Sequence, residues 1–405
     1  METRTDKITE IVLKAARKAR RETSSAPQQE GRGRANWPLD CTVGPGLEGA
    51  IACETKIGFV NGTRGELTYC GYDIFDLCAY STFEEVSYLL LYGRMPTAKQ
   101  FASFKRKLVK SRSLPHTLRL LMGFPLEQMH PMACLRLGTN LMRQRLTWQD
   151  SDAARPDSVA AIAADEDSIP METIPKGEQK AIYEFKKRKT ERPAKVPEGT
   201  EDAAGLAACI RLISGLSTIA AAVARVRDHK LPIEPDPELG HAANYLYMMN
   251  GVRPTPEQER IMDIALILHA DHGMNASTFA SMVVASTLSD IYFSIGSGIA
   301  ALSGPLHGGA NEAVLVMLEK IGHPDNVDAW FDKAMRRKKK IMGMGHRVYK
   351  TYDPRARILG PLASYVARDN PDAALLLRIA RKLEKRVVES LGKEKNIFPN
   401  VDYYS

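Results

Sequence analysis

The chain has 405 residues, of which 44% are hydrophobic and 26% are charged. This balance is typical of globular proteins and excludes global disorder, a collagen-like fibre and a disulfide-rich miniprotein. Lysine and arginine outnumber aspartate and glutamate by 56 to 48, giving a net charge of +8, which favours anionic partners such as a phosphorylated cofactor, a di- or tricarboxylate or nucleic acid.

The N-terminus predicts a basic helix followed by a linker. Apolar residues recur at helical spacing at Ile8, Val12, Ala15 and Ala19. The first 21 residues carry seven lysines or arginines and three acids, and no apolar signal core is present, which argues against secretion. The glycine-, proline- and serine-rich segment that follows is typical of a linker. We therefore interpret residues 1–45 as a basic N-terminal arm and linker.

From residue 46 onward the predicted elements are a small sheet and then helices. Short β-branched and aromatic pieces between glycines in residues 46–71 predict strands or turns. Capping boxes mark helix starts at Thr82 and Thr255. Apolar residues three and four apart predict two later helices, ending at Gly322 and Gly392. Alternating strand patterns are nearly absent, so the predicted fold class is mainly α.

Residues 150–201 interrupt the helical pattern. They are rich in Asp, Glu, Lys, Pro and Ala, with an acidic half before a basic half, and predict a charged insertion that is partly ordered at most. The basic run at 186–195 could touch nucleic acid. It carries no series of aromatic residues on which bases would stack, so a solvated surface is the simpler interpretation and nucleic acid is an unlikely partner.

Cysteine use and hydropathy bear on the compartment. The six cysteines form no Cys-x-x-Cys pair, so a zinc ribbon or a disulfide framework has little support and reduced thiols in the cytoplasm are expected. The longest apolar run, Leu206–Val226, contains Arg211 and Arg225. A membrane span is therefore not predicted.

Three clusters in the last third of the chain combine residue types that core packing does not require. In the first, HADHGMNAS, His269 and His272 would share one face of a continuing helix. Zinc could bind such a pair, but no third ligand follows at a metalloprotease spacing, so no metal site is predicted. A hydrogen-bonded structural pair and an anion-binding imidazole both stay open.

The second cluster places His307 in a glycine-rich turn, SGPLHGGAN, that leads into the helix carrying Val314. The start of a helix lowers the pKa of an imidazole and favours the neutral ring as a hydrogen-bond donor to a developing oxyanion. A tight turn with a capping histidine explains the same pattern.

The third cluster, GMGHRVYKTYDPR, holds His346, Lys350 and Arg355. Its glycines allow a ligand to approach the backbone, and its cations would neutralise phosphates or carboxylates. A basic surface loop is the alternative. Near the C-terminus, Asp402 follows a Pro-Asn turn, where a carboxyl beside an apolar pocket could have the raised pKa of a general base.

In order and content, the segments HADHGMNASTFA, LSGPLHGGANEAV, GMGHRVYKTYDPRA and FPNVDYYS resemble the citrate synthase family. The resemblance covers residues from about 45 to 405, with 150–201 as an insertion. It implies a mainly α, two-domain fold with a cleft, a large domain at 46–306 and a small domain at 307–405. It also implies a homodimer or a higher homo-oligomer.

The reaction that the resemblance implies is the condensation of acetyl-CoA with oxaloacetate and water to give citrate and CoA, with no metal and no permanently bound cofactor. By motif position, Asp402 would remove a proton from acetyl-CoA, and His307 would donate a hydrogen bond to the enol oxygen. His346 would polarise the ketone of oxaloacetate, and His272 and Arg355 would hold its carboxylates. Residues along CoA would be Lys340, Ile341, Met342, Gly343, Met344 and Lys350.

These roles predict that His307, His346 and Asp402 converge on one cleft. Two departures from the family pattern accompany the insertion: Cys70 stands where the family commonly has arginine, and the family's usual C-terminal tail, which brings further arginines to the carboxylates, does not follow Ser405. Two alternatives remain: a 2-methylcitrate synthase that uses propionyl-CoA, and an inactive scaffold of this fold that assembles with partners.

Overall fold

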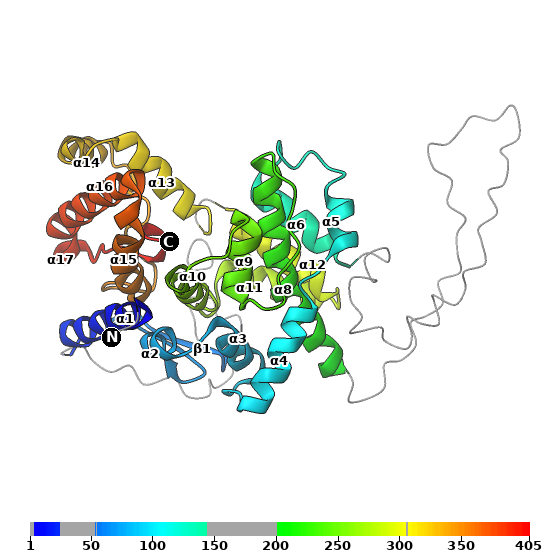
Figure 1. Ribbon diagram of the computed structural model, residues 1–405. Coiled ribbons are helices and arrows are strands. Elements are labelled where there is room, and N and C mark those ends of the chain that lie inside the picture. The colour runs from blue at the N-terminus through cyan, green and yellow to red at the C-terminus, as the bar shows by residue number, and fades with distance from the viewer. Residues whose placement is uncertain (1–3, 25–52, 54, 144–200, 305–306) are drawn as a thin grey trace, which may run out of the picture.

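Helices dominate the described part of the chain (Figure 1). The structure is a computed structural model that describes residues 4–24, 53, 55–143, 201–304 and 307–405. Within these ranges the strands form one three-stranded antiparallel sheet in the order β1-β2-β3. The predicted mainly α fold is confirmed. Of the predicted insertion 150–201, only Glu201, the first residue of α8, lies among the described residues.

The described helices and strands form two groups along the chain, one before and one after residues 144–200. The first group is α1 (Arg4–Glu22), β1 (Gly58–Asn61), β2 (Glu66–Tyr69), β3 (Tyr72–Asp73), α2 (Ile74–Tyr80), α3 (Phe83–Tyr92), α4 (Ala98–Lys110), α5 (Pro115–Leu121) and α6 (Pro131–Leu141). The second group is α8 (Glu201–Arg227), α9 (His241–Asn250), α10 (Pro256–Leu268), α11 (Ala276–Ser286), α12 (Ile291–Leu302), α13 (Ala310–Ile321), η3 (Pro324–Asn326), α14 (Val327–Arg336), α15 (Pro354–Val366), η4 (Ala367–Asp369), α16 (Pro371–Val387), η5 (Val388–Gly392), α17 (Lys393–Lys395) and η6 (Val401–Tyr403).

Local sequence signals explain where several helices begin and end. Thr82 and Thr255 each accept a hydrogen bond from a backbone N–H three residues on, and the side chains of Glu85 and Gln258 accept from the N–H of the cap. These are the two predicted capping boxes. α3 ends at Gly93, whose φ of 71° lies in the left-handed region that favours glycine. Both predicted helix starts are therefore confirmed.

The sheet supports the loop that leads into α15. A two-residue turn, Cys70 and Gly71, joins β2 to β3, and both residues have positive φ, as such hairpin turns require. In the turn between β1 and β2, a Cβ on Gly62 would lie 2.1 Å from the carbonyl oxygen of Val348. The carbonyl of Gly62 accepts a hydrogen bond from Lys350 N at 2.9 Å. The absence of a side chain at Gly62 thus lets this loop rest against the sheet.

α1 is packed into the body of the protein. Its apolar residues, Ile8 and Val12 among them, are buried in one hydrophobic cluster with side chains of β2, α2, α3, α10 and α15. At its C-terminal end, Glu22 forms an ion pair with Arg357 of α15. The predicted helix exists, but it is not a free arm, because its apolar face is covered.

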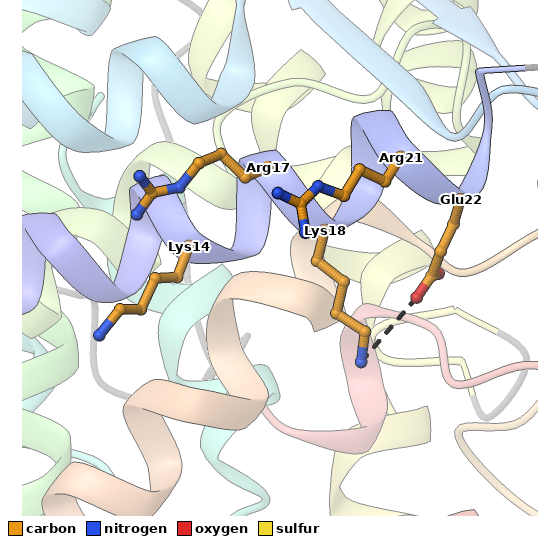
Figure 2. Close-up of a pocket in the computed structure, with 5 residues that line it drawn as sticks. All are labelled: Lys14, Arg17, Lys18, Arg21 and Glu22. Carbon is orange, nitrogen blue, oxygen red and sulfur yellow. Dashed lines mark ion pairs between the residues drawn. The ribbon is translucent and has the colours of Figure 1, made fainter.

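The opposite face of α1 is exposed and basic. Lys14, Arg17, Lys18, Arg21 and Glu22 line an open surface cavity of about 400 Å³ (Figure 2). Lys18 Nζ lies 3.9 Å from a carboxylate oxygen of Glu22, and a solvated ion pair of this kind adds little stability. None of the predicted site residues lines this cavity.

The remaining helices bury a small cluster that α3, α4 and α8 share, and two larger clusters. One joins α13, α14 and α16 to the loop around Met344 and to Tyr403 of η6, and it lies wholly within residues 314–403. The other joins α5, α6, α8 and α12. Ile358 and Leu362 of α15, however, pack in the cluster that holds α1 and α10. The predicted domain boundary at residues 306–307 stays a prediction, since the last hundred residues share two cores.

One helix segment, Gly205–Arg227, is long and apolar enough to cross a membrane by length and composition alone. In the structure, 56% of the tested window is buried, and α8 packs against α4, α6, α9 and α12. The apolar character of α8 is therefore accounted for by its place in the helical core.

Candidate active site

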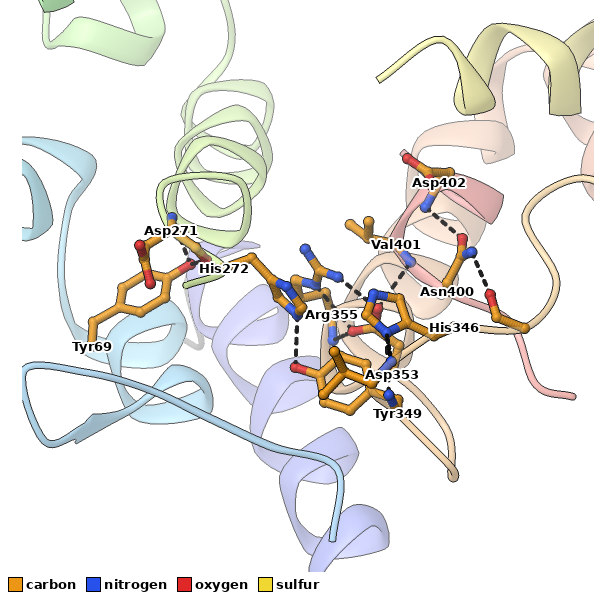
Figure 3. Close-up of polar contacts among 12 residues, drawn as sticks. Tyr69, Asp271, His272, His346, Tyr349, Asp353, Arg355, Asn400, Val401 and Asp402 are labelled. Carbon is orange, nitrogen blue, oxygen red and sulfur yellow. Dashed lines mark hydrogen bonds and ion pairs between the residues drawn. The ribbon is translucent and has the colours of Figure 1, made fainter. Parts of the chain in front are cut away.

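Three of the predicted site residues gather beside one loop (Figure 3). His272 comes from the turn after α10, His346 from the loop before α15, and Arg355 from the first turn of α15. The imidazole rings of His272 and His346 have their centroids 5.2 Å apart, edge to face. The structure thus brings together segments that the sequence separates widely.

His269 and His272 are not on one helical face. α10 ends at Leu268, and His269 is its C-cap, with Nδ1 2.7 Å from the carbonyl oxygen of Ala265. His272 lies beyond the turn, with Nε2 3.2 Å from the hydroxyl of Tyr349. The shared face expected from a continuing helix is therefore wrong, and only His272 joins the site.

Both imidazoles are neutral at pH 7. Burial, with Arg355 adding to it, lowers the pKa of His272 to about 3, and burial lowers the pKa of His346 to about 4. His346 Nδ1 accepts hydrogen bonds from the backbone N–H groups of Val348 at 3.0 Å and Tyr349 at 3.1 Å. The ring proton of His346 is therefore on Nε2, which can act as a neutral hydrogen-bond donor.

Asp353 and Arg355 form a buried, two-pronged ion pair. Nε and Nη2 of Arg355 donate to the two carboxylate oxygens of Asp353 at 3.1 and 2.9 Å. Burial alone would raise the pKa of Asp353, but the charge and hydrogen bonds of Arg355 hold it below its usual value, so the carboxylate stays ionised. Nη1 of Arg355 is the guanidinium nitrogen that Asp353 does not engage, and it is suited to a ligand carboxylate.

The turn that carries Asp402 is tied to the same loop and the same carboxylate. Val401 N donates to Asp353 Oδ2 at 3.1 Å. Asn400 Nδ2 donates to Gly345 O at 2.8 Å, and Asn400 Oδ1 accepts from Asp402 N at 3.1 Å. Burial raises the pKa of the Asp402 carboxyl, as a general base in an apolar setting requires.

The imidazole of His307 is hydrogen-bonded to α11 and not to the loop that holds His346. Its Nε2 lies 2.8 Å from Ser277 Oγ on α11, and the same Oγ lies 2.9 Å from the carbonyl oxygen of Gly298 on α12. Burial lowers the pKa of His307, in line with the neutral donor that the sequence favours. In the described residues its ring is hydrogen-bonded to Ser277 rather than to His346 or Asp402. Convergence of the three residues on one cleft stays a prediction.

The residues predicted to lie along CoA divide into two sets. Lys340 and Met342 line a cavity of about 390 Å³ at the start of α13, together with Lys320 and Trp330. Ile341 and Met344, by contrast, are each only 5% exposed and pack in the core, so only their backbone can contact a ligand. Of the other two, Gly343 is buried against the core, where a Cβ would lie 2.8 Å from side-chain atoms of Val314 and Tyr403, and the exposed Lys350 donates to Arg347 O at 3.0 Å.

Ser277, Tyr349, Asp353 and Asn400 contact predicted site residues, and the sequence reasoning did not assign them roles. All four lie inside the quoted motifs, which was the available signal. Asp353 was recognisable as the N-cap before a proline at the first position of a helix. Among the described residues, no group of three or more His, Cys, Asp or Glu side chains is arranged to hold a metal ion.

Comparisons with known proteins point to one family. A family model described as "Citrate synthase, C-terminal domain" matches residues 46–405. The citrate synthase of Deinococcus radiodurans is 38% identical over 363 residues, which cover 90% of this chain and 83% of that protein. The citrate synthase of Acidithiobacillus ferridurans is 37% identical, with 89% of this chain and 82% of its own length covered.

Solved structures show the same fold. Citrate synthase from Pyrobaculum aerophilum has a TM-score of 0.72 at 33% identity, with 93% of this chain and 85% of that chain covered. The enzyme from Thermoplasma acidophilum, in a ternary complex with carboxymethyl coenzyme A and oxaloacetate, has a TM-score of 0.71 at 31% identity, with 90% and 84% covered.

Relatives and structures together define a mainly α acyltransferase. This chain belongs to the citrate synthase family. The resemblance, the fold class and the enzyme class predicted from the sequence are confirmed, and the citrate synthase interpretation is favoured over the alternatives.

Proposed function

We propose that this chain condenses acetyl-CoA with oxaloacetate and water to give citrate and CoA, the entry step of the tricarboxylic acid cycle. One observation carries the proposal: the buried Asp353–Arg355 pair holds a free guanidinium edge beside two neutral imidazoles and also anchors the turn of Asp402. This set provides cationic binding, neutral donors and a carboxylate base, which are the groups that an enol condensation needs.

Oxaloacetate is placed by the first part of this set. Arg355 Nη1 and the neutral ring of His272 hold its carboxylates, and His346 Nε2–H donates to the ketone oxygen. When the enol carbon bonds to the ketone carbon, the π electrons of the ketone move onto its oxygen and form an alkoxide. The neutral donor stabilises this alkoxide. His346 then gives its Nε2 proton to this oxygen, and the ring is reprotonated from solvent before the next turnover.

The methyl group of acetyl-CoA is activated by the second part. Asp402 takes a methyl proton, and His307 donates a hydrogen bond to the thioester oxygen as it becomes an enol. Neither step suffices alone, because a thioester α-proton is weakly acidic and leaves only if the oxyanion is stabilised at the same moment. The base and the hydrogen-bond donor each raise the reaction rate by a factor of about 10²–10⁴. Closure of the cleft around the substrates brings His307 to Asp402 and excludes water until condensation is complete. Water then attacks the carbonyl carbon of the thioester product, the carbon–sulfur bond breaks, and CoA leaves as the thiol while the new carboxylate completes citrate.

CoA is bound beside the start of α13. The cavity at Lys340 and Met342 is open, has room for part of a nucleotide and carries lysines for phosphate groups. No cofactor is bound permanently, and acetyl-CoA acts as co-substrate.

The activity is tested by CoA release, followed with a thiol-reactive dye. Purified protein should release CoA only when acetyl-CoA and oxaloacetate are both present. Propionyl-CoA should have a kcat/KM about 10–200-fold lower, the usual cost of one extra methylene in a fitted pocket. Faster turnover of propionyl-CoA would assign a 2-methylcitrate synthase. Folded protein that releases no CoA at millimolar substrates would support the inactive scaffold.

A homodimer is proposed as well, formed through α11 and α12. These two helices pack on each other, yet α11 has no buried residue and both are strongly apolar. Phe279, Val283 and Phe293 are 39%, 49% and 44% exposed. An apolar face of this kind marks an interface, and a second copy supplies the matching apolar face through a two-fold axis.

The dimer predicts the behaviour of Val283→Asp. Two-fold symmetry places this charge in the interface twice, so the dimer dissociation constant should rise at least a hundredfold and the variant should run as a monomer. Size-exclusion chromatography with light scattering measures this directly. Val366→Asp is the matched control, since Val366 is 54% exposed on α15 and should leave the mass unchanged. An intact Val283→Asp dimer would place the interface elsewhere.

A cytoplasmic location is proposed on the state of the thiols. Cys53, Cys70, Cys78, Cys134 and Cys209 are all free in the structure. Burial raises the pKa of Cys78 and Cys209, so these thiols are protonated and unreactive. Unpaired thiols are typical of a reducing compartment. Fractionation of cells that make this protein would test the location.

A further inference from the structure

Tyr349 contacts both imidazoles of the site, although the proposed chemistry gives it no role. Its hydroxyl lies 3.2 Å from His272 Nε2, and its backbone N–H donates to His346 Nδ1 at 3.1 Å. Its ring centroid is 5.4 Å from that of His272 and 4.8 Å from that of His346. The residue is 1% exposed. One buried side chain therefore joins the two histidines (Figure 3).

The buried hydroxyl fixes the direction of the bond to His272. Burial holds the pKa of Tyr349 well above its usual value, so the phenol keeps its proton. Within the described ranges, His272 Nε2 is the hydrogen-bond partner of this hydroxyl. A buried phenol that fails to donate its proton loses a hydrogen bond that water would have supplied. The hydroxyl therefore donates to Nε2, and the single proton of the neutral ring is on Nδ1.

We propose that Tyr349 is a positioning residue that sets the tautomers of both imidazoles: His272 through its hydroxyl, and His346 through its backbone N–H. This inference rests on the proposed function, in which His272 Nδ1–H faces a carboxylate of oxaloacetate and His346 Nε2–H faces the ketone. A neutral imidazole that exchanges between two tautomers can bind oxaloacetate only while it is in the correct one. The apparent affinity for oxaloacetate then falls in proportion to the fraction of rings in that tautomer.

Besides a hydrogen bond to its own backbone, His272 has no charged neighbour among the described residues that sets its tautomer without Tyr349. The charged and titratable groups that face it are Arg355 and Asp353 from α15 and its N-cap, and His346 from the loop. The carboxylate of Asp353 already accepts hydrogen bonds from Arg355 and from Val401 N. His346 Nδ1 already accepts hydrogen bonds from two backbone N–H groups. Both therefore act as acceptors, and the proposed function directs the two remaining donors, Arg355 Nη1 and His346 Nε2–H, to oxaloacetate. Among the described residues, the hydrogen-bond partner of His272 Nε2 is Tyr349.

Tyr349→Phe separates the two halves of the proposal, because it removes the hydroxyl and keeps the backbone N–H. We expect the KM for oxaloacetate to rise about three- to tenfold, the inverse of the fraction of His272 rings that keep the proton on Nδ1, while kcat and the KM for acetyl-CoA change less than twofold. Tyr352→Phe is the matched control. Tyr352 lies on the same loop, with its ring near Arg357 and Phe398, and the variant should keep all three constants.

Nitrogen NMR of ¹⁵N-histidine-labelled protein gives a second readout that needs no substrate. At pH 7, wild-type His272 should show a protonated Nδ1 and an unprotonated Nε2, and His346 the reverse; His272→Gln and His346→Gln assign the signals. In Tyr349→Phe, His272 alone should become a mixture of tautomers.

An Nε2-protonated His272 in the wild type, or an unchanged KM for oxaloacetate in folded Tyr349→Phe, would overturn the proposal. If Tyr349→Phe fails to fold, the wild-type spectrum decides it. Wild-type protein that releases no CoA would count against the proposed function instead, while the spectrum still reports on the bond between Tyr349 and His272.

Discussion

Replacement of Asp402 by asparagine is expected to lower kcat by a factor of about 10²–10⁴, the usual contribution of a general base. Asparagine keeps the shape of the side chain and accepts no proton. The backbone N–H of Asp402 still donates to Asn400, so the turn should hold its place. CoA release at saturating substrates measures the loss, and near-identical unfolding curves for variant and wild type would show that the fold is intact.

The pH profile sharpens this prediction. Burial raises the pKa of Asp402 above its usual value, so the base loses its charge at a higher pH than an ordinary carboxylate. The kcat of the wild type should therefore fall on the acid side as this group is protonated, and Asp402→Asn should lack that limb. Asp372→Asn, at an exposed acid in the first turn of α16, should keep both rate and profile. Retention of more than a tenth of wild-type kcat by Asp402→Asn would mean that another group is the base.

Replacement of Asp353 by alanine is expected to cost about 3–5 kcal/mol of unfolding free energy. The carboxylate is 1% exposed and accepts hydrogen bonds from Arg355 and from Val401 N. Its loss leaves the buried Arg355 guanidinium without its counter-ion. It also releases the turn that carries Asp402, so CoA release should fall to the background rate. Urea unfolding followed by circular dichroism, at one protein concentration, measures the stability.

Two further variants separate charge from packing. Asp325→Ala removes a carboxylate that is 85% exposed in its ion pair with His323, and it should change the unfolding free energy by less than about 1 kcal/mol. The double variant Asp353→Leu with Arg355→Met removes both buried charges and should recover most of the stability, because no charge is left unpaired. It should stay inactive. A stable, active Asp353→Ala would show that this pair neither supports the fold nor places Asp402.

The helices were predictable to the extent that their signals are local. A capping box such as Thr255 with Gln258 acts within one turn, so the sequence alone identifies it. The segment that packs against the apolar face of a helix can lie far away in the sequence. The spacing of Ile8 and Val12 identifies the buried side of α1, but only the assembled chain shows that α15 covers it. For this reason the expected arm is part of the body.

The site shows the same division. His272, His346 and Arg355 were identifiable by residue type and motif order, and the structure places them together. Asp353 and Tyr349 act through geometry that no motif states, because each depends on atoms of distant segments, Val401 N for one and His272 Nε2 for the other. The position of His307 relative to Asp402 depends on how the two sides of the cleft come together, which local sequence does not encode.

The packing of α1 has a consequence for synthesis of the protein. Glu22 and Arg357, which join α1 to α15, are 335 residues apart, and α1 lies before the 46–405 region that the family model matches. Side chains of β2, α2 and α3 are made soon after α1 and can cover part of its apolar side, but the part that packs against α15 stays uncovered until that helix has been made. Closing so long a loop is slow, and an exposed amphipathic helix is prone to associate with other chains in the meantime. Productive folding of this protein therefore depends on keeping the apolar side of α1 from contact with other chains until α15 has been made.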